Sequence, residues 1–458
     1  MNKILPYNDK DPICIENYAK GLIGKTFEEA VGNIRLKKGN KGGLGQLLEK
    51  YYFKYELNSN SEADFKEAGV ELKVSGYKIN KSKKVSAKER MVLNMINYME
   101  VHKEVFENSS FLKKNKLLLL ILYLYEKEID RLDFIIKYVQ LFQFPEKDLK
   151  IIEDDWNTII NKIKTGKAHE ISEGDTNYLA ACTKGTNKNS VREQPFCNIP
   201  AKQRAFSLKP AYLTHILNEY IIKGKKTYDD SIVKSIDELE DITFEQFVLQ
   251  KIKKHKGKTI NELAKEFKVI ANPKGKSFTY EVAKGLLGVK GKHIEEFEKA
   301  NIQIKTIRIE NTGNIKQHMS FPAFKFTEII REEWKMCTLR EMFLNTRFLF
   351  IVYRFDENNQ LKLERGMFWN IPCDDLENDI REVWERTVGI IKSGVKIIKR
   401  TKKREYNNLP NSKDNRVAHV RPHTNKKTNT YPLPTGGKFT KQSFWLNNSY
   451  ILSQINDN

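Results

Sequence analysis

Cysteine is scarce in this sequence: five residues are spread over 458 positions, and no two form a Cys-x-x-Cys pair. Neither a zinc module nor a disulfide framework is therefore indicated.

Long apolar runs are also missing. The N-terminal stretch lacks the apolar region of a signal peptide, and the longest apolar run, Leu117–Tyr125, is too short to span a membrane. We therefore expect a cytoplasmic protein that does not bind a membrane.

Acidic residues are in deficit, because 59 Asp and Glu stand against 80 Lys and Arg and leave a formal net charge of +21. Such a surplus favours binding to a polyanion, since neutralised phosphates release their counterions. Membrane-surface binding would need an amphipathic or lipidated anchor, and none is evident. Nucleic acid is the favoured partner, with a merely soluble or ribosome-associated basic protein as the alternative.

A complete phosphate-binding loop is also absent. The segment GLIGKT, Gly21–Thr26, ends like a P-loop but has two residues between its glycines where the loop requires four. We expect a turn that enters a helix capped by Thr26.

What is present is an internal repeat. The chain is too long for one ordinary core, and its 40% hydrophobic and 11% aromatic residues can fill two or three. Five pairs of similar segments recur in the same order, at offsets between 228 (384 − 156) and 238 (424 − 186) residues. The pairs begin at Gly24 and Gly257, Phe65 and Phe297, Lys116 and Arg347, Trp156 and Trp384, and Thr186 and Thr424. A duplication predicts one domain over residues 1–232 and a second over 240–458.

Hydrophobic periodicity predicts the elements of the first copy. Helical spacing of apolar residues indicates helices over Gly42–Phe53 and Asp154–Lys164. Alternation over Val70–Val74 indicates a strand with one polar face, and the continuous run Leu117–Tyr125 indicates a strand buried on both faces. We therefore predict an α/β fold in which each copy has a mixed β-sheet flanked by helices.

The segment EADFKEAGVELKV combines carboxylates and a lysine. On a strand, Glu71 and Lys73 project from the same face, and Asp64 could join them if the segment bends into a hairpin. Two carboxylates could hold a hard cation, and the ammonium could orient or deprotonate a water that attacks a phosphodiester. A solvated charged strand is the alternative, because other Glu-x-Lys triplets occur in the chain.

The repeat helps to weigh these alternatives. In the second copy, Glu296, Gln303 and Lys305 align with Asp64, Glu71 and Lys73, so a neutral amide replaces the central carboxylate. If the motif is catalytic, one copy cuts and the other only binds.

These segments resemble a known family. The stretches KGGLGQLLEKYYF and DFKEAGVELKV are similar to the motif pair of the MutH family, which belongs to the PD-(D/E)xK nuclease superfamily. The whole pattern resembles the Sau-type restriction endonucleases, which have two MutH-like domains and cut at GATC. The resemblance implies tandem restriction-endonuclease-like domains and double-stranded DNA as the substrate. It implies a monomer or a DNA-induced dimer, with a cognate DNA methyltransferase in the same restriction system.

The resemblance also assigns the catalytic residues. It implies that Asp64, Glu71 and Glu49 ligate Mg²⁺ and that Lys73 assists the attacking water, with Gln46 as a weaker candidate on the helix that carries Glu49. The expected reaction is hydrolysis by in-line attack of water, which leaves a 5′-phosphate. A mismatch-repair-type nickase and a sequence-specific DNA-binding protein without catalysis remain as alternatives.

Two loops are candidates for DNA contacts. The DNA-binding candidates are Lys184, Thr186, Asn187 and Arg204 in the first copy, and Arg421, His423 and Asn425 in the second. Arginine is the usual bidentate partner of guanine, and small polar residues bond phosphates and base edges. The first loop has Thr-Lys where the second copy and the family's nickase have Arg-Pro, so base contacts do not transfer one for one. The basic run at residues 399–404 suits phosphate anchoring or simple solvation.

Overall fold

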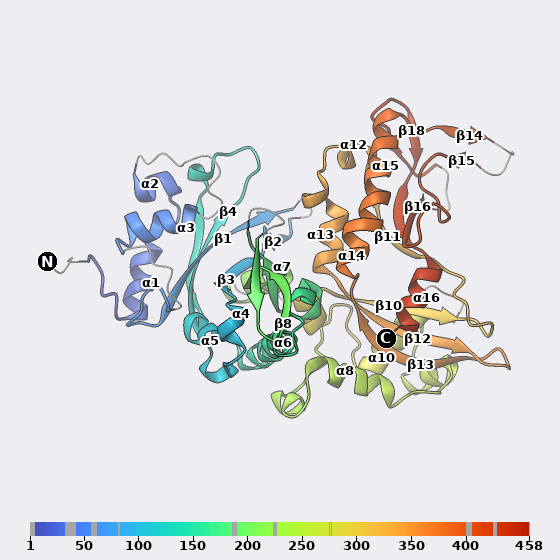
Figure 1. The fold of residues 1–458 in the computed structure, drawn as a ribbon, viewed down its shortest axis with the longest axis horizontal. Helices are drawn as coiled ribbons and strands as arrows, with labels where there is room; N and C mark the ends of the chain where they lie inside the picture. Colours follow the sequence, from blue (N-terminus) through green and yellow to red (C-terminus); the bar gives the residue numbers. More distant parts are fainter. Residues whose placement is uncertain are drawn as a thin grey trace. The chain divides into compact units, whose positions relative to one another are not determined.

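The computed structural model divides into two compact units (Figure 1). It describes residues 5–32, 43–55, 62–80, 83–185, 190–222, 227–273, 275, 277–399, 405–424 and 428–457. The N-unit comprises Met1–Phe247 and Val289–Ile302, and the C-unit comprises Val248–Gly288 and Gln303–Asn458. The repeat-based division at residues 232–240 stays a prediction. Packing departs from it in two respects, because residues 240–247 and Val289–Ile302 pack with the N-unit although the repeat puts both in the second copy.

The N-unit is built on a four-stranded sheet of order β2-β1-β4-β5. Its strands are β1 (Val70–Ile79), β2 (Val85–Ala87), β4 (Leu117–Leu124) and β5 (Ile136–Phe142). Strand β1 is parallel to β4, and the other pairs are antiparallel. The run of leucines and isoleucine in β4 is buried along almost its whole length, which confirms the predicted buried strand. The sequence-based prediction of an α/β fold is correct.

A second, antiparallel sheet of order β3-β9-β6 adjoins a hairpin in the N-unit. Its strands are β3 (Met91–Met95), β6 (Leu179–Thr183) and β9 (Arg204–Leu208), and the hairpin is β7 (Val191–Gln194) with β8 (Cys197–Lys202). The N-unit helices are α1 (Pro12–Lys20), α2 (Phe27–Val31), α3 (Gly43–Leu47), α4 (Tyr98–Val101), α5 (Ser110–Asn115), α6 (Glu146–Lys164), α7 (Pro210–Ile216) and α11 (Glu295–Ala300). Figure 1 shows α1, α2 and α3 gathered beside β1 and β4.

Local sequence explains several helix ends. Thr26 caps α2, and its hydroxyl accepts from the Glu29 N–H while the Glu29 carboxylate accepts from the Thr26 N–H, as the capping-box prediction requires. The predicted helix at residues 42–53 is present as α3 followed by a π-helical turn, Leu48–Tyr52. The predicted helix at 154–164 is the second half of α6, whose Trp156 is 1% exposed.

The C-unit repeats this plan with the sheets β10-β12-β13 and β11-β19-β16. Its strands are β10 (Ile302–Ile309), β11 (Met319–Phe324), β12 (Arg347–Phe355), β13 (Leu361–Trp369), β16 (Ala418–Pro422) and β19 (Gln442–Leu446), with the hairpins β14 (Ile397–Lys399) and β15 (Glu405–Asn407), and β17 (Thr430–Pro432) and β18 (Lys438–Thr440). Its helices are α8 (Phe244–Lys253), α9 (Ile260–Glu266), α10 (Phe278–Leu287), α12 (Phe326–Ile329), α13 (Thr338–Asn345), α14 (Cys373–Asp375), α15 (Arg381–Ser393) and α16 (Asn448–Asn456). Helix α8 and strand β10 each begin in residues of the N-unit.

Individual contacts also recur, as a duplication predicts. In the N-unit, the Gly24 N–H donates to the Ile136 carbonyl (2.9 Å). In the C-unit, the Gly257 N–H donates in the same way to Leu363 (2.8 Å). A buried tyrosine–aspartate bond is repeated too, with the pairs Tyr212–Asp148 (3.0 Å) and Tyr450–Asp375 (2.7 Å).

Within the described residues, no helix combines the length and apolar character that a membrane crossing needs.

Candidate active site

A tight turn brings Asp64 next to strand β1. The backbones of Phe65 and Val70 exchange two hydrogen bonds, of 2.9 and 3.2 Å, across this turn. Gly69 closes the turn with a φ of +63°, a left-handed conformation that glycine adopts without strain. The segment therefore has the bent-hairpin shape that would place Asp64 beside Glu71.

The two carboxylates are locked to the backbone of this hairpin. The Asp64 N–H donates to Oε2 of Glu71 (3.1 Å), and the Leu72 N–H donates to Oδ2 of Asp64 (2.9 Å). Glu71 is only 3% exposed, so the expected polar strand face is a buried one rather than a solvated surface. Burying a carboxylate is costly unless it is paired, and lysines supply the pairing here.

Two ammonium groups approach the same carboxylate oxygen. Lys73 Nζ lies 2.7 Å from Oε1 of Glu71 and also donates to the Leu93 carbonyl (3.2 Å). Lys114 Nζ, from the end of α5, lies 3.6 Å from the same oxygen. Lys114 was not predicted from the sequence, because it is one of two adjacent lysines in a helix some forty residues after the motif. Lys73 is thus held by Glu71 and β3, in a fixed position beside the carboxylates.

Glu49 lies on the π-helical turn after α3. Its carboxylate interacts electrostatically with the charged groups of the motif. Burial raises the pKa of Glu49, as does the negative charge of Glu71, while Lys73 and Lys114 oppose the rise. Gln46, one turn earlier, is exposed. Of the two candidates on this helix, Glu49 therefore has the environment of a site residue.

Asp64 and Tyr55 both have raised pKa values in this site. Burial raises the pKa of Asp64 to about 7, and the charges of Glu71 and Glu49 add to the effect. The Tyr55 hydroxyl is buried and has no hydrogen-bond partner among the described residues, and burial and the same three carboxylates raise its pKa. No pattern in the sequence pointed to Tyr55. An acid of raised pKa beside an unpartnered hydroxyl is typical of a functional pocket.

The donor set suits a hard divalent cation in kind, since it consists of carboxylate oxygens whose mutual repulsion a cation would relieve. The side chains are not yet gathered around a metal position: among the described residues, no three His, Cys, Asp or Glu side chains are close enough to hold an ion. One oxygen of Glu71 is instead occupied by lysines. Asp64, Glu71 and Glu49 would therefore have to turn towards an arriving ion.

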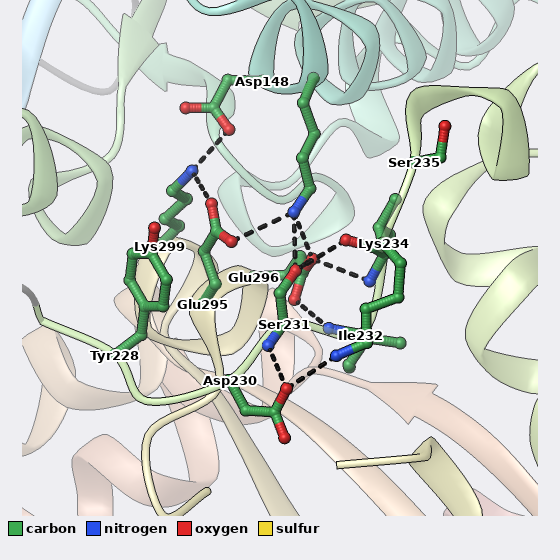
Figure 2. A network of polar contacts seen from close by, with 12 residues as sticks. Asp148, Tyr228, Asp230, Ser231, Ile232, Lys234, Ser235, Glu295, Glu296 and Lys299 are labelled. Atoms are coloured by element: carbon green, nitrogen blue, oxygen red, sulfur yellow. Dashed lines mark hydrogen bonds and ion pairs between the residues drawn. The ribbon is translucent and has the colours of Figure 1, made fainter.

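The second copy of the motif has the same backbone but different side-chain surroundings. Asn301, immediately before β10, has a left-handed φ of 52°, as Gly69 has before β1, which supports the alignment of the two copies. Gln303, the counterpart of Glu71, is exposed. Glu296, the counterpart of Asp64, is fully buried in a polar network of the N-unit (Figure 2).

This network uses the Glu296 carboxylate as a structural anchor. It accepts from the N–H groups of Ile232 (2.9 Å) and Val233 (3.0 Å) and from the Ser231 hydroxyl (2.6 Å). Lys147 Nζ at the start of α6 lies 3.0 Å from it. These partners use both oxygens of Glu296, so its position corresponds to that of Asp64 while its chemical role differs.

The predicted DNA contacts of the first copy lie around β6 and β9. The Lys184 N–H donates to the Gln203 carbonyl (2.7 Å), and its side chain is half-buried. Gly185 has a φ of +108°, and an added Cβ would overlap the side chain of Ser190. Thr186 and Asn187 lie outside the described residues.

Arg204 differs from the expectation of a direct DNA contact. It is 5% exposed, and its guanidinium donates to the carbonyls of Ala181 (2.6 Å) and Ile171. Since these bonds use the side chain inside the fold, Arg204 supports the strands that carry the loop. Arg204 was a candidate because its segment, QRAFSLKPAYLTHIL, resembles the family, and such a resemblance does not distinguish support from contact.

The predicted contacts of the second copy lie at the end of β16. Arg421 and His423 are both exposed, and the Arg421 guanidinium lies over the Trp445 ring, 5.0 Å from its centroid. His423 Nδ1 is 3.1 Å from the Ser443 hydroxyl. Asn425 and most of the basic run at 399–404 lie outside the described residues. The two described side chains are accessible and held by β19, as groove-reading groups would need to be.

Comparison with known proteins agrees with this geometry. Residues 53–155, which include the whole motif from Asp64 to Lys73, match the family model described as DNA mismatch repair enzyme MutH. The chain is also 38% identical to the type II restriction enzyme Sau3AI of Staphylococcus aureus, over 97% of this chain and 98% of that enzyme. The chain therefore belongs to the MutH-like family of type II restriction endonucleases, which are site-specific deoxyribonucleases.

Proposed function

We propose that this protein hydrolyses double-stranded DNA at GATC sites with Mg²⁺ and leaves 5′-phosphate ends. The observation that carries the proposal is the carboxylate cluster at the start of β1, in which burial and the charge of Glu71 raise the pKa values of Asp64 and Glu49 beside a fixed lysine. The identity to a type II restriction enzyme and the formal net charge of +21 support DNA as the substrate. GATC rests on the family resemblance.

Each residue has a separate task in this proposal. Asp64 and Glu71 hold the metal, and Glu49 completes its shell. When bound, Mg²⁺ would supply positive charge that activates water and offsets charge developing on the phosphate. With Glu71 holding the ion, Lys73 would no longer be paired with that carboxylate. Its ammonium could then align the water for in-line attack, and only the neutral amine could accept a proton from that water.

The C-unit binds a second GATC site and acts as an effector. The loss of the central carboxylate at Gln303 and the engagement of Glu296 in a structural network support binding without cutting. Exposed Arg421 and His423 are the side chains that would read that site. The protein is then a monomer or a DNA-induced dimer, and a methyltransferase of the same restriction system protects host DNA.

A cleavage assay tests the proposal. Purified protein is incubated with plasmid that contains GATC sites, with Mg²⁺ or with EDTA, and the ends are mapped. We expect Mg²⁺-dependent linear fragments whose ends fall at GATC and accept ligation through a 5′-phosphate. Intact plasmid would contradict the enzyme assignment, and nicked circles alone would instead support a repair-type nickase.

A further inference from the structure

The lysine of the motif has been retained in the C-unit, although Gln303 replaces the carboxylate with which it is paired in the N-unit. Lys305 corresponds to Lys73, and both lysines reach the first strand of the second sheet. Lys73 donates to a carbonyl of β3, whereas the Lys305 ammonium lies 5.5 Å from the ring centroid of Phe321 in β11 and 5.9 Å from that of Phe348. The chain has thus kept the position of the ammonium and lost its counter-charge.

No anion in the described part of the chain compensates Lys305. Its ammonium forms no ion pair and no hydrogen bond with the residues that the structure describes. Burial alone lowers its pKa, with no carboxylate to oppose the shift. Removing an ammonium from water without a partner is costly, so this position would gain from an arriving anion.

Lys305 lines a cavity of about 330 Å³ within the C-unit, and most of the charged residues in its described lining are basic. Arg308, Lys316 and His318 share the lining, and the one acidic lining residue, Glu310, is already paired with Lys316 (2.8 Å). Arg308 is exposed and has no ion pair among the described residues. Because Lys305 and Arg308 project from opposite faces of β10, Lys305 is the half-buried lining cation that has no anion among the described residues.

His318 links this cavity to the predicted DNA-reading strand. Its Nδ1 accepts from the Asn448 N–H (3.0 Å), so the neutral ring carries its proton on Nε2 and can act as a donor. Burial lowers the pKa of His318, and the positive charge of Arg421 lowers it further. Arg421 on β16 is thus close enough to act electrostatically on the cavity lining.

We propose that this cavity, named here the Lys305 pocket, binds a backbone phosphate of duplex DNA without hydrolysing it. Lys305 supplies the charge, and His318 supplies a neutral donor, as in phosphate contacts that position DNA without reading its bases. The inference rests on the proposed function, because it specifies how the C-unit holds its DNA. The pocket keeps the phosphate-binding half of a nuclease site without the metal-binding half.

Binding measurements on the full chain test this inference. Fluorescence anisotropy follows a labelled GATC duplex and a scrambled duplex across a salt series, in EDTA so that no cutting occurs. We expect Lys305→Met to weaken both duplexes about equally, roughly three- to tenfold, and to make the slope of log K against log salt shallower by about 0.9, the loss of one phosphate contact. The matched control is Lys325→Met, which removes an exposed lysine paired with Glu328 (2.7 Å).

A thermal melt separates binding from folding. Methionine suits a half-buried position between phenylalanine rings, so Lys305→Met should leave the Tm unchanged or raise it. The inference is overturned if Lys305→Met binds like Lys325→Met, or if its binding loss comes with a lowered Tm. It is also overturned if inorganic phosphate raises the Tm of the wild type but not of Lys305→Met while the salt slope is unchanged, since the pocket would then bind free phosphate. Failure of cleavage alone would leave these binding results intact.

Discussion

The two copies of the motif share a strand and turn but differ in the charge and burial of their side chains. In the N-unit, Asp64 and Glu71 are buried carboxylates held beside Lys73, and burial and mutual repulsion raise the pKa of Asp64 to about 7. In the second copy of the motif, Gln303 is neutral and exposed, and Glu296 is held within the N-unit by the N–H groups of residues 232 and 233 and by Lys147. A strand and turn can thus be retained while one carboxylate of the motif is replaced by an amide and the other becomes part of a structural network.

The largest expected effect is on cleavage by Asp64→Asn. Removing a proposed metal ligand should lower the cleavage rate by about 10³-fold or more, because the charge that stabilises the transition state is lost. DNA binding in EDTA should remain. Single-turnover cleavage of a GATC duplex measures the effect, with Glu67→Gln as the control, since Glu67 is an exposed acid paired with Lys10 (2.7 Å). Equal rates for both variants would remove Asp64 from the site.

The aligned change in the other copy should act on stability instead. Glu296→Gln leaves Lys147 and the backbone donors of residues 232–233 without their buried anion. We expect a loss of about 3 kcal/mol in the free energy of unfolding, with cleavage per folded molecule unchanged. Denaturant titration compares it with Glu298→Gln, an exposed acid that pairs with His293 (2.9 Å). A folded Glu296→Gln protein that does not cut would show that Glu296 takes part in catalysis.

A smaller effect should appear in the pH dependence of stability without metal. The folded chain keeps a proton on Asp64 up to about pH 7, while the unfolded chain loses it near the ordinary value of 3.8. Since the folded state binds more protons in this window, its stability should fall as pH rises from about 4 to about 7, by up to about 4 kcal/mol.

Asp64→Asn supplies the reference for this pH effect. The Tm of wild type minus that of the variant should become more negative between pH 5 and pH 8 in EDTA, and Mg²⁺ should reduce the difference. A difference that does not change with pH would contradict the proposed strain at Asp64.

Sequence reasoning reached the motif because its signals are local. Strand alternation and a seven-residue spacing place Asp64, Glu71 and Lys73 together, and the repeat exposed Gln303 as the weak point of the second copy. Lys114 and Tyr55 were out of reach, since they come from a distant helix and an irregular segment and join the site only through tertiary packing. The burial of Glu296 and Arg204 could not be predicted either, because aligning two segments shows which positions correspond but not how exposed each side chain is.

The central claim is that the carboxylate at position 71 separates the cutting copy from the binding copy. Its most direct test is Glu71→Gln, which gives the N-unit the residue found in the C-unit. Plasmid cleavage with Mg²⁺ and duplex binding in EDTA are measured on the same preparation. The account predicts neither nicked nor linear plasmid, with duplex affinity within a few-fold of wild type. Continued cutting by Glu71→Gln would contradict it.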